Sequence, residues 1–346
     1  MKSLIIRADA SPEIGTGHVM RCLALAEAWQ DTGGEVFFVS ACDAPALDVR
    51  LRKERFQILH ISQDAGSLGD ADETARIANT LGTNWIVTDG YHFGAQYQKT
   101  IKDSGLSLLF IDDYGHADHY YADIILNQNI YADMSFYPKY EPYTRFLLGT
   151  KYALIRKEFL KWSDWHRDIP EVARKILVTL GGSDPDNVTL KVIEAVRTVD
   201  LDGLEVKVVV GGANPHFDLI YESVKDLPNF TLIKNAETMP ELMAWADIAI
   251  SAGGSTCWEL AYMGVPSILC PIAENQKLIT QELYKIHTAV GFSLGGLTLT
   301  SMEDVTHFIT SFLKKRQLRS GLSRTQKEIV DGTGAKNIVS IMIGET

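Results

Sequence analysis

The chain has 346 residues, of which 46% are hydrophobic and 22% are charged. This length predicts roughly two domains, each able to bury a core, and excludes a disordered or collagen-like chain. With 33 Lys and Arg residues against 44 Asp and Glu residues, the net charge of −11 disfavours nucleic acid and anionic membranes as partners.

Short apolar runs alternate with helix-length segments along the chain. The expected strands are residues 4–7, 36–40, 85–88, 108–111, 176–180, 206–210, 248–251 and 267–270. The expected helices include residues 19–29, 71–81, 188–199 and 258–263. Continuous apolar runs are typical of parallel strands that are buried on both faces. The alternation therefore predicts an α/β fold with doubly wound sheets.

A turn-rich, aromatic and then charged stretch interrupts this alternation at residues 134–172. The next expected strand begins directly after it. We therefore expect two α/β domains of similar size, residues 1–155 and residues 156–346. Two such halves would enclose a cleft, which is a preferred location for small-ligand sites.

The sequence shows no targeting or metal-type cysteine pattern. The first apolar run, residues 4–6, is too short for a signal peptide, and no run approaches the length of a membrane span. Cys22, Cys42, Cys257 and Cys270 lack the close pairing of zinc or redox sites. We therefore expect a cytoplasmic protein in a reducing compartment.

The first chemical motif is a glycine turn, Gly15 and Gly17, which precedes His18 and opens a helix. Met20 stands where the dinucleotide-binding fingerprint has Gly or Ala, so NAD binding is disfavoured. The dipole at a helix N-terminus disfavours an imidazolium, and Arg21, one turn later, acts in the same direction. Both effects favour a neutral His18 that can accept a proton. A capping or core histidine fits the spacing equally well.

Several carboxylates leave alternatives open. Asp9, at the end of the first strand, either orients the ring of His18 or bonds the loop backbone. Asp184 and Asp186 match a pattern of metal-dependent sugar transferases. Their place before a helix, with the proline between them at the first helical position, favours caps instead. The acidic, histidine-containing loop at residues 112–119 is expected to be solvated rather than metal-binding. No metal site is predicted.

Four apolar runs in the second half end in paired glycines. The pairs are Gly181 with Gly182, Gly211 with Gly212, Gly253 with Gly254, and Gly295 with Gly296. Glycine permits positive φ and close backbone approach, and ligands of open α/β sheets bind beyond the carboxyl ends of the strands. Each pair alone also fits an ordinary turn between a strand and a helix.

The pair that ends at Gly254 is different because Ser255 and Thr256 follow it and open a helix. The free N–H groups of a helix start can hold a diphosphate, and the two hydroxyls add donors. Glu259, one turn inside the helix, can accept hydrogen bonds from a ribose diol. The structural alternative is a capping box of Thr256 and Glu259, which needs no glycine pair before it.

These motifs together resemble a known family. Residues 7–26, RADASPEIGTGHVMRCLALA, resemble the N-terminal signature of the UDP-2,4-diacetamido-2,4,6-trideoxy-β-L-altropyranose hydrolases of pseudaminic acid biosynthesis. Residues 88–91 and 152–159 also match, and the resemblance continues through GGST, Glu259 and the pair Asn275-Gln276. It covers nearly the whole chain. The GGST segment is shared with the wider GT-B superfamily.

The resemblance implies a GT-B fold of two Rossmann-like domains, the C-terminal one binding UDP and the N-terminal one facing the sugar. It implies metal-independent hydrolysis at the anomeric carbon with inversion, with no cofactor and a UDP-linked diacetamido sugar as substrate. His18 would be the catalytic base, and Tyr91 would line the sugar site. The candidate binding residues are Gly15, Gly17, Arg156, Gly181, Gly182, Gly254, Ser255, Thr256, Glu259, Asn275 and Gln276.

On this hypothesis a water held by His18 attacks C1, while Ser255 and Thr256 stabilise charge on the leaving UDP. Diphosphate is a good leaving group, so the paired carboxylates of glycosidases are not required. The main alternative is a GT-B glycosyltransferase with a UDP-sugar donor, which differs only in its acceptor. An NAD-linked oxidoreductase and a non-catalytic nucleotide-sugar binder are further alternatives. The oligomeric state stays open, a monomer included.

Overall fold

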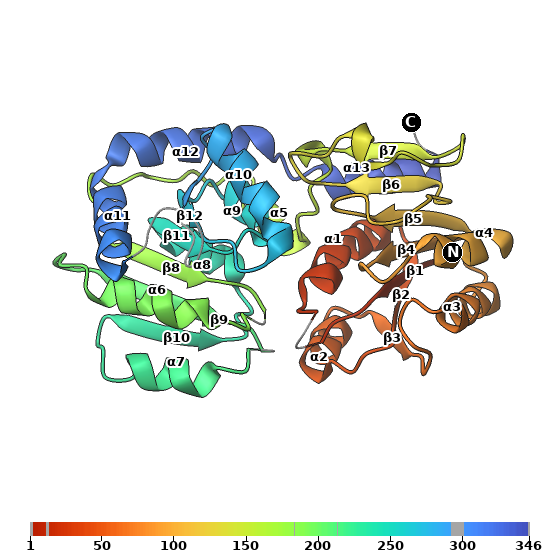
Figure 1. The fold of residues 1–346 in the computed structure, drawn as a ribbon, viewed down its shortest axis with the longest axis horizontal. Coiled ribbons are helices and arrows are strands. Elements are labelled where there is room, and N and C mark those ends of the chain that lie inside the picture. The colour runs from red at the N-terminus through yellow and green to blue at the C-terminus, as the bar shows by residue number, and fades with distance from the viewer. Residues whose placement is uncertain (1–2, 12–13, 183, 213, 292–300, 345–346) are drawn as a thin grey trace. The chain divides into compact units, whose positions relative to one another are not determined.

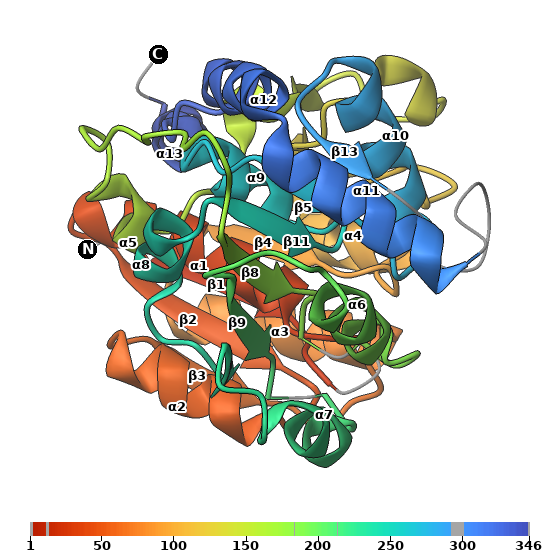
Figure 2. The same cartoon turned by 90° about the vertical axis from the view of Figure 1, so that its left-hand side faces the viewer.

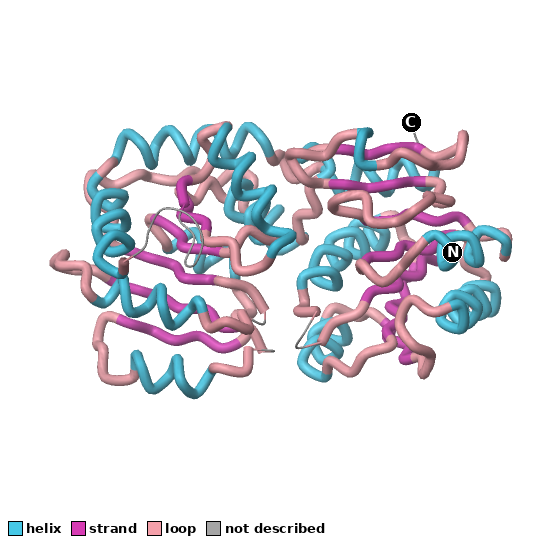
Figure 3. Tube along the Cα trace, in the orientation of Figure 1, coloured by secondary structure: helices cyan, strands magenta, loops and turns pink. Residues whose placement is uncertain are grey.

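The computed structural model describes residues 3–11, 14–182, 184–212, 214–291 and 301–344. The chain divides into two compact units, the first made of Met1–Lys157 with Gly332–Thr346 and the second of Glu158–Asp331. Figures 1 and 3 show that the strands of each unit lie together, with helices around them. Glycines 295 and 296 lie outside the described residues.

The first unit has a seven-stranded sheet in the order β3-β2-β1-β4-β5-β6-β7, and every described pairing is parallel. The strands are β1 (Ser3–Ala8), β2 (Glu35–Ser40), β3 (Gln57–His60), β4 (Trp85–Asp89), β5 (Ser107–Ile111), β6 (Ile124–Asn127) and β7 (Arg145–Leu148). The helices are α1 (Gly17–Asp31), α2 (Pro45–Lys53), α3 (Leu68–Thr80), α4 (Ala95–Asp103) and α13 (Gly334–Ile343), with the 3-10 turns η1 (Met134–Phe136) and η2 (Thr150–Tyr152).

The second unit has a six-stranded parallel sheet in the order β10-β9-β8-β11-β12-β13. The strands are β8 (Lys175–Thr179), β9 (Glu205–Val210), β10 (Phe230–Lys234), β11 (Ile248–Ser251), β12 (Ser267–Leu269) and β13 (Val290–Gly291). The helices are α5 (Lys157–Leu160), which spans the division, α6 (Val188–Arg197), α7 (Phe217–Val224), α8 (Met239–Trp245), α9 (Thr256–Tyr262), η3 (Glu274–Gln276), α10 (Lys277–Lys285), α11 (Met302–Lys314) and α12 (Arg316–Ile329). Helices α6 and α11 pack against each other in this unit (Figure 2).

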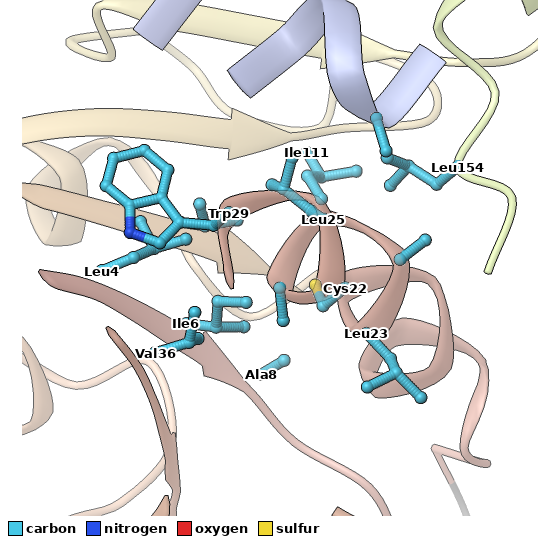
Figure 4. Close-up of a cluster of buried hydrophobic side chains, with 14 of the residues drawn as sticks. Leu4, Ile6, Ala8, Cys22, Leu23, Leu25, Trp29, Val36, Ile111 and Leu154 are labelled. Carbon is cyan, nitrogen blue, oxygen red and sulfur yellow. The ribbon is translucent and has the colours of Figure 1, made fainter. Parts of the chain in front are cut away.

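The core of the first unit forms where α1 packs on its sheet. Leu25 and Trp29 of α1 are at most 1% exposed and share one cluster with Leu4 and Ile6 of β1 (Figure 4). Residues 21–26 of α1 are all buried, so this helix is covered on more than one face, as expected for a helix with apolar residues all round. The α/β prediction is therefore confirmed.

The last helix, α13, belongs to the first unit rather than to the second, where residues 332–346 were expected. Its apolar residues, among them Ile338 and Met342, join the cluster that contains α1. A Cβ on Gly334 would lie 2.3 Å from the carbonyl oxygen of Ala153, so the returning chain packs closely on the segment before α5. The apolar pattern of a helix does not show which of the two hydrophobic cores the helix packs against. For this reason the sequence assigned residues 332–346 to the C-terminal domain, which precedes them in the chain.

The stretch expected to connect the two domains also contains a strand. Residues Arg145–Leu148 form β7, the edge strand of the first sheet, where Phe146 pairs with Ile125 of β6. The boundary between the two units therefore lies after this strand, at Lys157. None of the helices in the described ranges combines the length and apolar character that crossing a membrane requires.

Both sheets have the same switch in chain direction. In the first sheet the chain moves outward from β1 on one side and from β4 on the other, and in the second sheet from β8 and β11. Ligands of open α/β sheets bind at the carboxyl ends of such a strand pair. The two glycine motifs lie in the connections between β1 and α1 and between β11 and α9.

Candidate functional site

His18 is the second residue of α1 and follows the turn at the carboxyl end of β1. Gly15 in that turn has a φ of 76°, a conformation that favours glycine, and its N–H donates to the Ser11 carbonyl at 2.7 Å. The N-cap residue, Thr16, makes no side-chain cap hydrogen bond. The half-buried His18 makes no hydrogen bond to another described residue. Neither side chain therefore caps the helix.

The ring of His18 contacts the ring of Tyr91, the second residue after β4. The two centroids are 5.0 Å apart and the planes are nearly perpendicular, at 89°. The Tyr91 hydroxyl donates to Oδ2 of Asp113 at 2.8 Å. The structure therefore brings together the two side chains that the family resemblance assigned to catalysis and to the sugar site.

A buried ion cluster lies beside this pair. Arg21 donates through Nε and Nη2 to both carboxylate oxygens of Asp89, each at 2.6 Å, and through Nη1 to Asp113 at 2.8 and 3.1 Å. Asn129 adds a donor to Asp113 at 2.8 Å. Arg21 and Asp113 are 7% and 8% exposed, and Asp89 is fully buried. The attraction between the paired charges offsets the cost of removing them from water, and an unpaired charge at this depth would be strongly destabilising.

Burial is the main reason why the pKa of His18 lies below its usual value. The charge of Asp89 opposes this effect, and Arg21 lowers the pKa further. The direction agrees with the neutral imidazole expected from the sequence, but the principal cause differs. Arg21 acts in the expected direction, and the charges of Asp89 and Asp113 oppose it.

Asp9 does not orient the ring of His18. It accepts the backbone N–H of Ala41 at 2.8 Å, forms an ion pair with Arg7 at 2.7 Å, and lies 3.0 Å from Nε2 of His92. Although burial acts to raise it, His92 and Arg7 hold the pKa of Asp9 well below its usual range. The alternative of a bond to the loop backbone is therefore the one realised. His92 also belongs to this second cluster.

The acidic loop after β5 is structural rather than solvated. Asp112 is fully buried, and its carboxylate accepts the N–H groups of Tyr114 and Gly115 at 2.9 Å and the hydroxyl of Tyr120 at 2.5 Å. A carboxylate satisfied by its own loop fixes that loop. Among the described residues, no group of three or more His, Cys, Asp or Glu side chains is suited to a metal ion.

The corresponding edge of the second sheet is built from glycines. Gly181 has a φ of 92°, and a Cβ on Gly211 would lie 2.6 Å from Cα of Gly182. The turns after β8 and β9 therefore touch at a distance that only glycine permits. Near them, Asp184 accepts the N–H groups of Val188 at 2.9 Å and Thr189 at 2.8 Å, but the N-cap residue of α6 is Asn187, whose side chain accepts the N–H of Leu190. The proline after it precedes the helix instead of occupying its first position.

Gln276 supports the glycine turn after β11. Its Oε1 accepts the N–H of Gly253 at 3.2 Å and that of Ile272 at 2.9 Å. A Cβ on Gly253 would lie 2.5 Å from Cγ2 of Thr280 and 2.9 Å from the Gln276 carbonyl oxygen. Glycine is therefore required at this position by close packing. The neighbouring Asn275 is exposed.

The segment from Gly254 to Thr256 presents backbone donors. Within the described residues, the N–H groups of Gly254, Ser255 and Thr256 have no acceptor, whereas the N–H of Cys257 donates to the Gly254 carbonyl at 2.9 Å. The N-cap residue of α9 is Ser255 and not Thr256, and it makes no side-chain cap bond, so the alternative capping box of Thr256 and Glu259 is not formed. Half-buried Glu259 follows in the first turn.

Arg156 lies near a different part of the first unit. It is 5% exposed, and its charge acts on Glu27, which is more than two helical turns beyond His18 in α1. Burial raises the pKa of Glu27 to about 7. Of the candidate residues, Gly15, Gly17, His18 and Tyr91 lie at the carboxyl edge of the first sheet, and Gly181, Gly182, Gly254, Ser255, Thr256, Glu259, Asn275 and Gln276 lie at or near that of the second.

Sequence reasoning missed Asp89, Asp113 and Asn129 as members of the site. One signal could have found them. Each ends or closely follows a strand of the first sheet, and polar residues in that position meet at the carboxyl edge of a parallel sheet. The strand before Asn129, β6, was not expected, so this alignment was not visible.

Comparisons with known proteins give a match to one family model and three similar proteins. Residues 176–310 match the model of the glycosyltransferase family 28 C-terminal domain. Spore coat polysaccharide biosynthesis protein SpsG of Bacillus subtilis is 26% identical over 339 residues, which are 97% of this chain and 96% of that protein. The UDP-2,4-diacetamido-2,4,6-trideoxy-β-L-altropyranose hydrolase of Campylobacter jejuni is 25% identical over 242 residues, which are 69% of this chain and 81% of that protein. An uncharacterized protein of Methanocaldococcus jannaschii is 27% identical over 285 residues, and the match covers 57% of its length.

Solved structures define the fold class. MurG of Acinetobacter baumannii superposes with a TM-score of 0.65 and 16% identity, covering 99% of this chain and 100% of that one. MnaA of S. aureus, solved with UDP, gives a TM-score of 0.68 and 12% identity, covering all of this chain and 98% of that one. The chain has the GT-B fold, as expected.

Proposed function

We propose that this chain is an enzyme that acts on a UDP-sugar. We further propose that it hydrolyses UDP-2,4-diacetamido-2,4,6-trideoxy-β-L-altropyranose to UDP and 2,4-diacetamido-2,4,6-trideoxy-L-altropyranose, as in pseudaminic acid biosynthesis. His18 carries the proposal, as a half-buried imidazole with a lowered pKa, beside Tyr91, at the switch point of the first sheet. The similarity to the Campylobacter jejuni hydrolase supports the substrate.

In the proposed reaction, the neutral imidazole of His18 accepts a proton from water. The water oxygen forms a bond to the anomeric carbon from the face opposite the diphosphate, and the carbon inverts. The bond between that carbon and the diphosphate oxygen breaks, and UDP leaves with the electron pair. The carboxylates of Asp89 and Asp113 lie close enough to favour the imidazolium that forms, since both raise the pKa of His18.

The second unit would bind the nucleotide. The unengaged N–H groups and hydroxyls of Ser255 and Thr256 would hold the diphosphate, and Glu259 would accept the ribose hydroxyls. The glycine turns at Gly181 and Gly254 leave room for close approach. The family 28 match over residues 176–310 supports this role, because it spans all of these residues. Arg156, Asn275 and Gln276 stay in the proposal as substrate contacts.

A GT-B glycosyltransferase with a UDP-sugar donor is the second candidate. The match to the glycosyltransferase family 28 model favours it directly. Both reactions need the same donor site, and they differ in whether water or another hydroxyl attacks the sugar. The deciding experiment must therefore identify the group that attacks the sugar.

The deciding experiment incubates the full chain with the UDP-linked diacetamido sugar in oxygen-18 water, with a chelator and without an acceptor. Label in the free sugar, with inversion seen by proton NMR, is the expected result. Label in UDP would mean cleavage at phosphorus and would overturn the proposal. UDP release that begins only after an acceptor alcohol is added would assign the glycosyltransferase reaction.

A further inference from the structure

The ring of His18 is held by an aromatic contact instead of by a carboxylate. A general base needs a fixed ring orientation, which is most often set by a hydrogen bond from its second nitrogen. No described residue supplies such a bond to His18. The nearly perpendicular ring of Tyr91, with its centroid 5.0 Å away, takes that place.

Tyr91 is in turn held by Asp113. Its hydroxyl donates to Oδ2 of Asp113 at 2.8 Å, and Asp113 is fixed by Arg21 and Asn129, each at 2.8 Å. Asp113 is 8% exposed, and burial strengthens hydrogen bonds to a charged acceptor. An unbroken series of contacts therefore runs from a buried ion pair to the imidazole.

We propose that Asp113 is a positioning residue that orients the imidazole of His18 through Tyr91. The inference rests on the proposed function, since it takes His18 as the base. It adds a role for Asp113 and gives Tyr91 a second task besides lining the sugar site. The hydroxyl of Tyr91 matters because it anchors the ring, and Asp113 matters because it anchors the hydroxyl.

Two substitutions separate this role from a purely electrostatic one. Four charged or titratable groups act on His18, namely Arg21 from α1, Asp89 and His92 from β4 and its following loop, and Asp113 after β5. Asp113→Asn removes one of the two carboxylates that raise the pKa of His18, so that pKa falls further. Tyr91→Phe leaves all four groups in place. Both substitutions remove the hydrogen bond that anchors the ring of residue 91, but only Asp113→Asn changes the charge near His18.

The test uses Asp113→Asn, Tyr91→Phe and the double variant. Each single variant is expected to lose about tenfold to a hundredfold in kcat with KM nearly unchanged, because a misplaced base slows the chemical step. The double variant is expected to lose no more than the stronger single variant, since both break one series of contacts. Losses that multiply would overturn the proposal.

A second readout needs no substrate. Proton NMR of the unliganded protein follows the His18 imidazole, assigned by its absence in His18→Gln. Both single variants are expected to shift its ring protons away from the values set by the Tyr91 ring, and only Asp113→Asn is expected to lower its pKa. Unchanged ring-proton shifts in Tyr91→Phe would overturn the proposal, even if Asp113→Asn failed to fold.

Asp123→Asn is the matched control. Asp123 also accepts a cation, Lys102 at 2.7 Å, and a backbone N–H, that of Leu108 at 2.7 Å, but it precedes β6 and lies outside the His18 cluster. It is expected to leave both readouts unchanged, and an equal effect would mean general destabilisation and overturn the proposal. If the NMR results are as expected but no UDP-sugar is hydrolysed, the positioning role stands and the proposed function fails.

Discussion

The carboxyl edges of the two sheets share one topology and differ in chemistry. At the first edge Arg21 is buried between Asp89 and Asp113, next to the aromatic and imidazole rings of Tyr91 and His18. At the second edge the turn after β11 contains Gly253, Gly254 and Ser255, and none of these residues can ionise. The residues that follow the strands therefore decide what each edge can do.

This contrast shows how two sheets with the same topology can meet two different chemical requirements. Charged and titratable groups must be held at fixed distances, which the first edge achieves with buried ion pairs and hydrogen bonds. Backbone donors need only an open approach, which glycine provides. In the function proposed above, the first edge performs the proton transfer and the backbone donors of the second edge hold the diphosphate. Each prediction below separates these two tasks.

Removal of the base should have the largest effect. His18→Ala is expected to lower kcat about a hundredfold to ten-thousandfold, the usual contribution of a general base. UDP affinity, measured by calorimetry, should stay as in the wild type because the second edge is unchanged. Turnover at the wild-type rate would remove His18 from the mechanism. A loss of UDP affinity as large as the loss of kcat would show that catalysis and UDP binding are not divided between the two edges.

Alanine substitutions at two adjacent glycines should separate the effect of close packing on stability from the effect of the turn on UDP binding. Gly253→Ala would place a Cβ 2.5 Å from Thr280 and 2.9 Å from the Gln276 carbonyl oxygen, whereas a Cβ on Gly254 would meet nothing nearer than 3.9 Å. Gly253→Ala is expected to cost about 1–3 kcal/mol in the free energy of unfolding, as overpacking does. Gly254→Ala should leave that free energy nearly unchanged.

The same pair of variants tests the anion site. Both are expected to weaken UDP binding, Gly253→Ala by moving the turn and Gly254→Ala by placing a methyl group beside the donors. Thermal unfolding and calorimetric titration measure the two quantities separately. If Gly254→Ala binds UDP as tightly as the wild type, the backbone donors of this turn do not hold the diphosphate.

Much of the fold could be predicted because its central strands are continuous apolar runs. The expected strand at residues 248–251 coincides with β11, and that at residues 85–88 differs from β4 by one residue. The missed strands are mostly short or lie at sheet edges. Lys234 of β10 and His60 of β3 are exposed, so polar side chains interrupt the apolar pattern that marks a buried strand.

The site was partly visible for a related reason. His18 and the GGST segment could be found because each follows a strand and opens a helix within one short stretch of sequence. The partners of Arg21 could not, since Asp89 and Asp113 are 68 and 92 residues away from it in the chain. Their meeting depends on the order of strands in the sheet, which local pattern does not fix.

The pH dependence of catalysis should depend on the first edge alone. A base acts in its neutral form, so activity is present above its pKa and is lost as the pH falls through it. Because burial lowers the pKa of His18, the acid limb of kcat/KM is expected below the ordinary histidine value of about 6.5. UDP binding should show no matching limb. An acid limb above that value would contradict the buried, neutral imidazole.

Ionic strength should have the smallest effect, and its sign shows whether cations or backbone donors hold the diphosphate. If lysine or arginine side chains held the diphosphate, added salt would screen them and weaken UDP binding. In the turn after β11 the donors are backbone N–H groups and hydroxyls, and Lys277 near this turn is ion-paired with Glu274 at 2.5 Å. Screening then acts mainly on the repulsion between the nucleotide and a chain of net charge −11. Between about 50 and 500 mM salt, the Kd for UDP is therefore expected to stay within about threefold or to fall slightly, and a steep rise would show that cations do the binding.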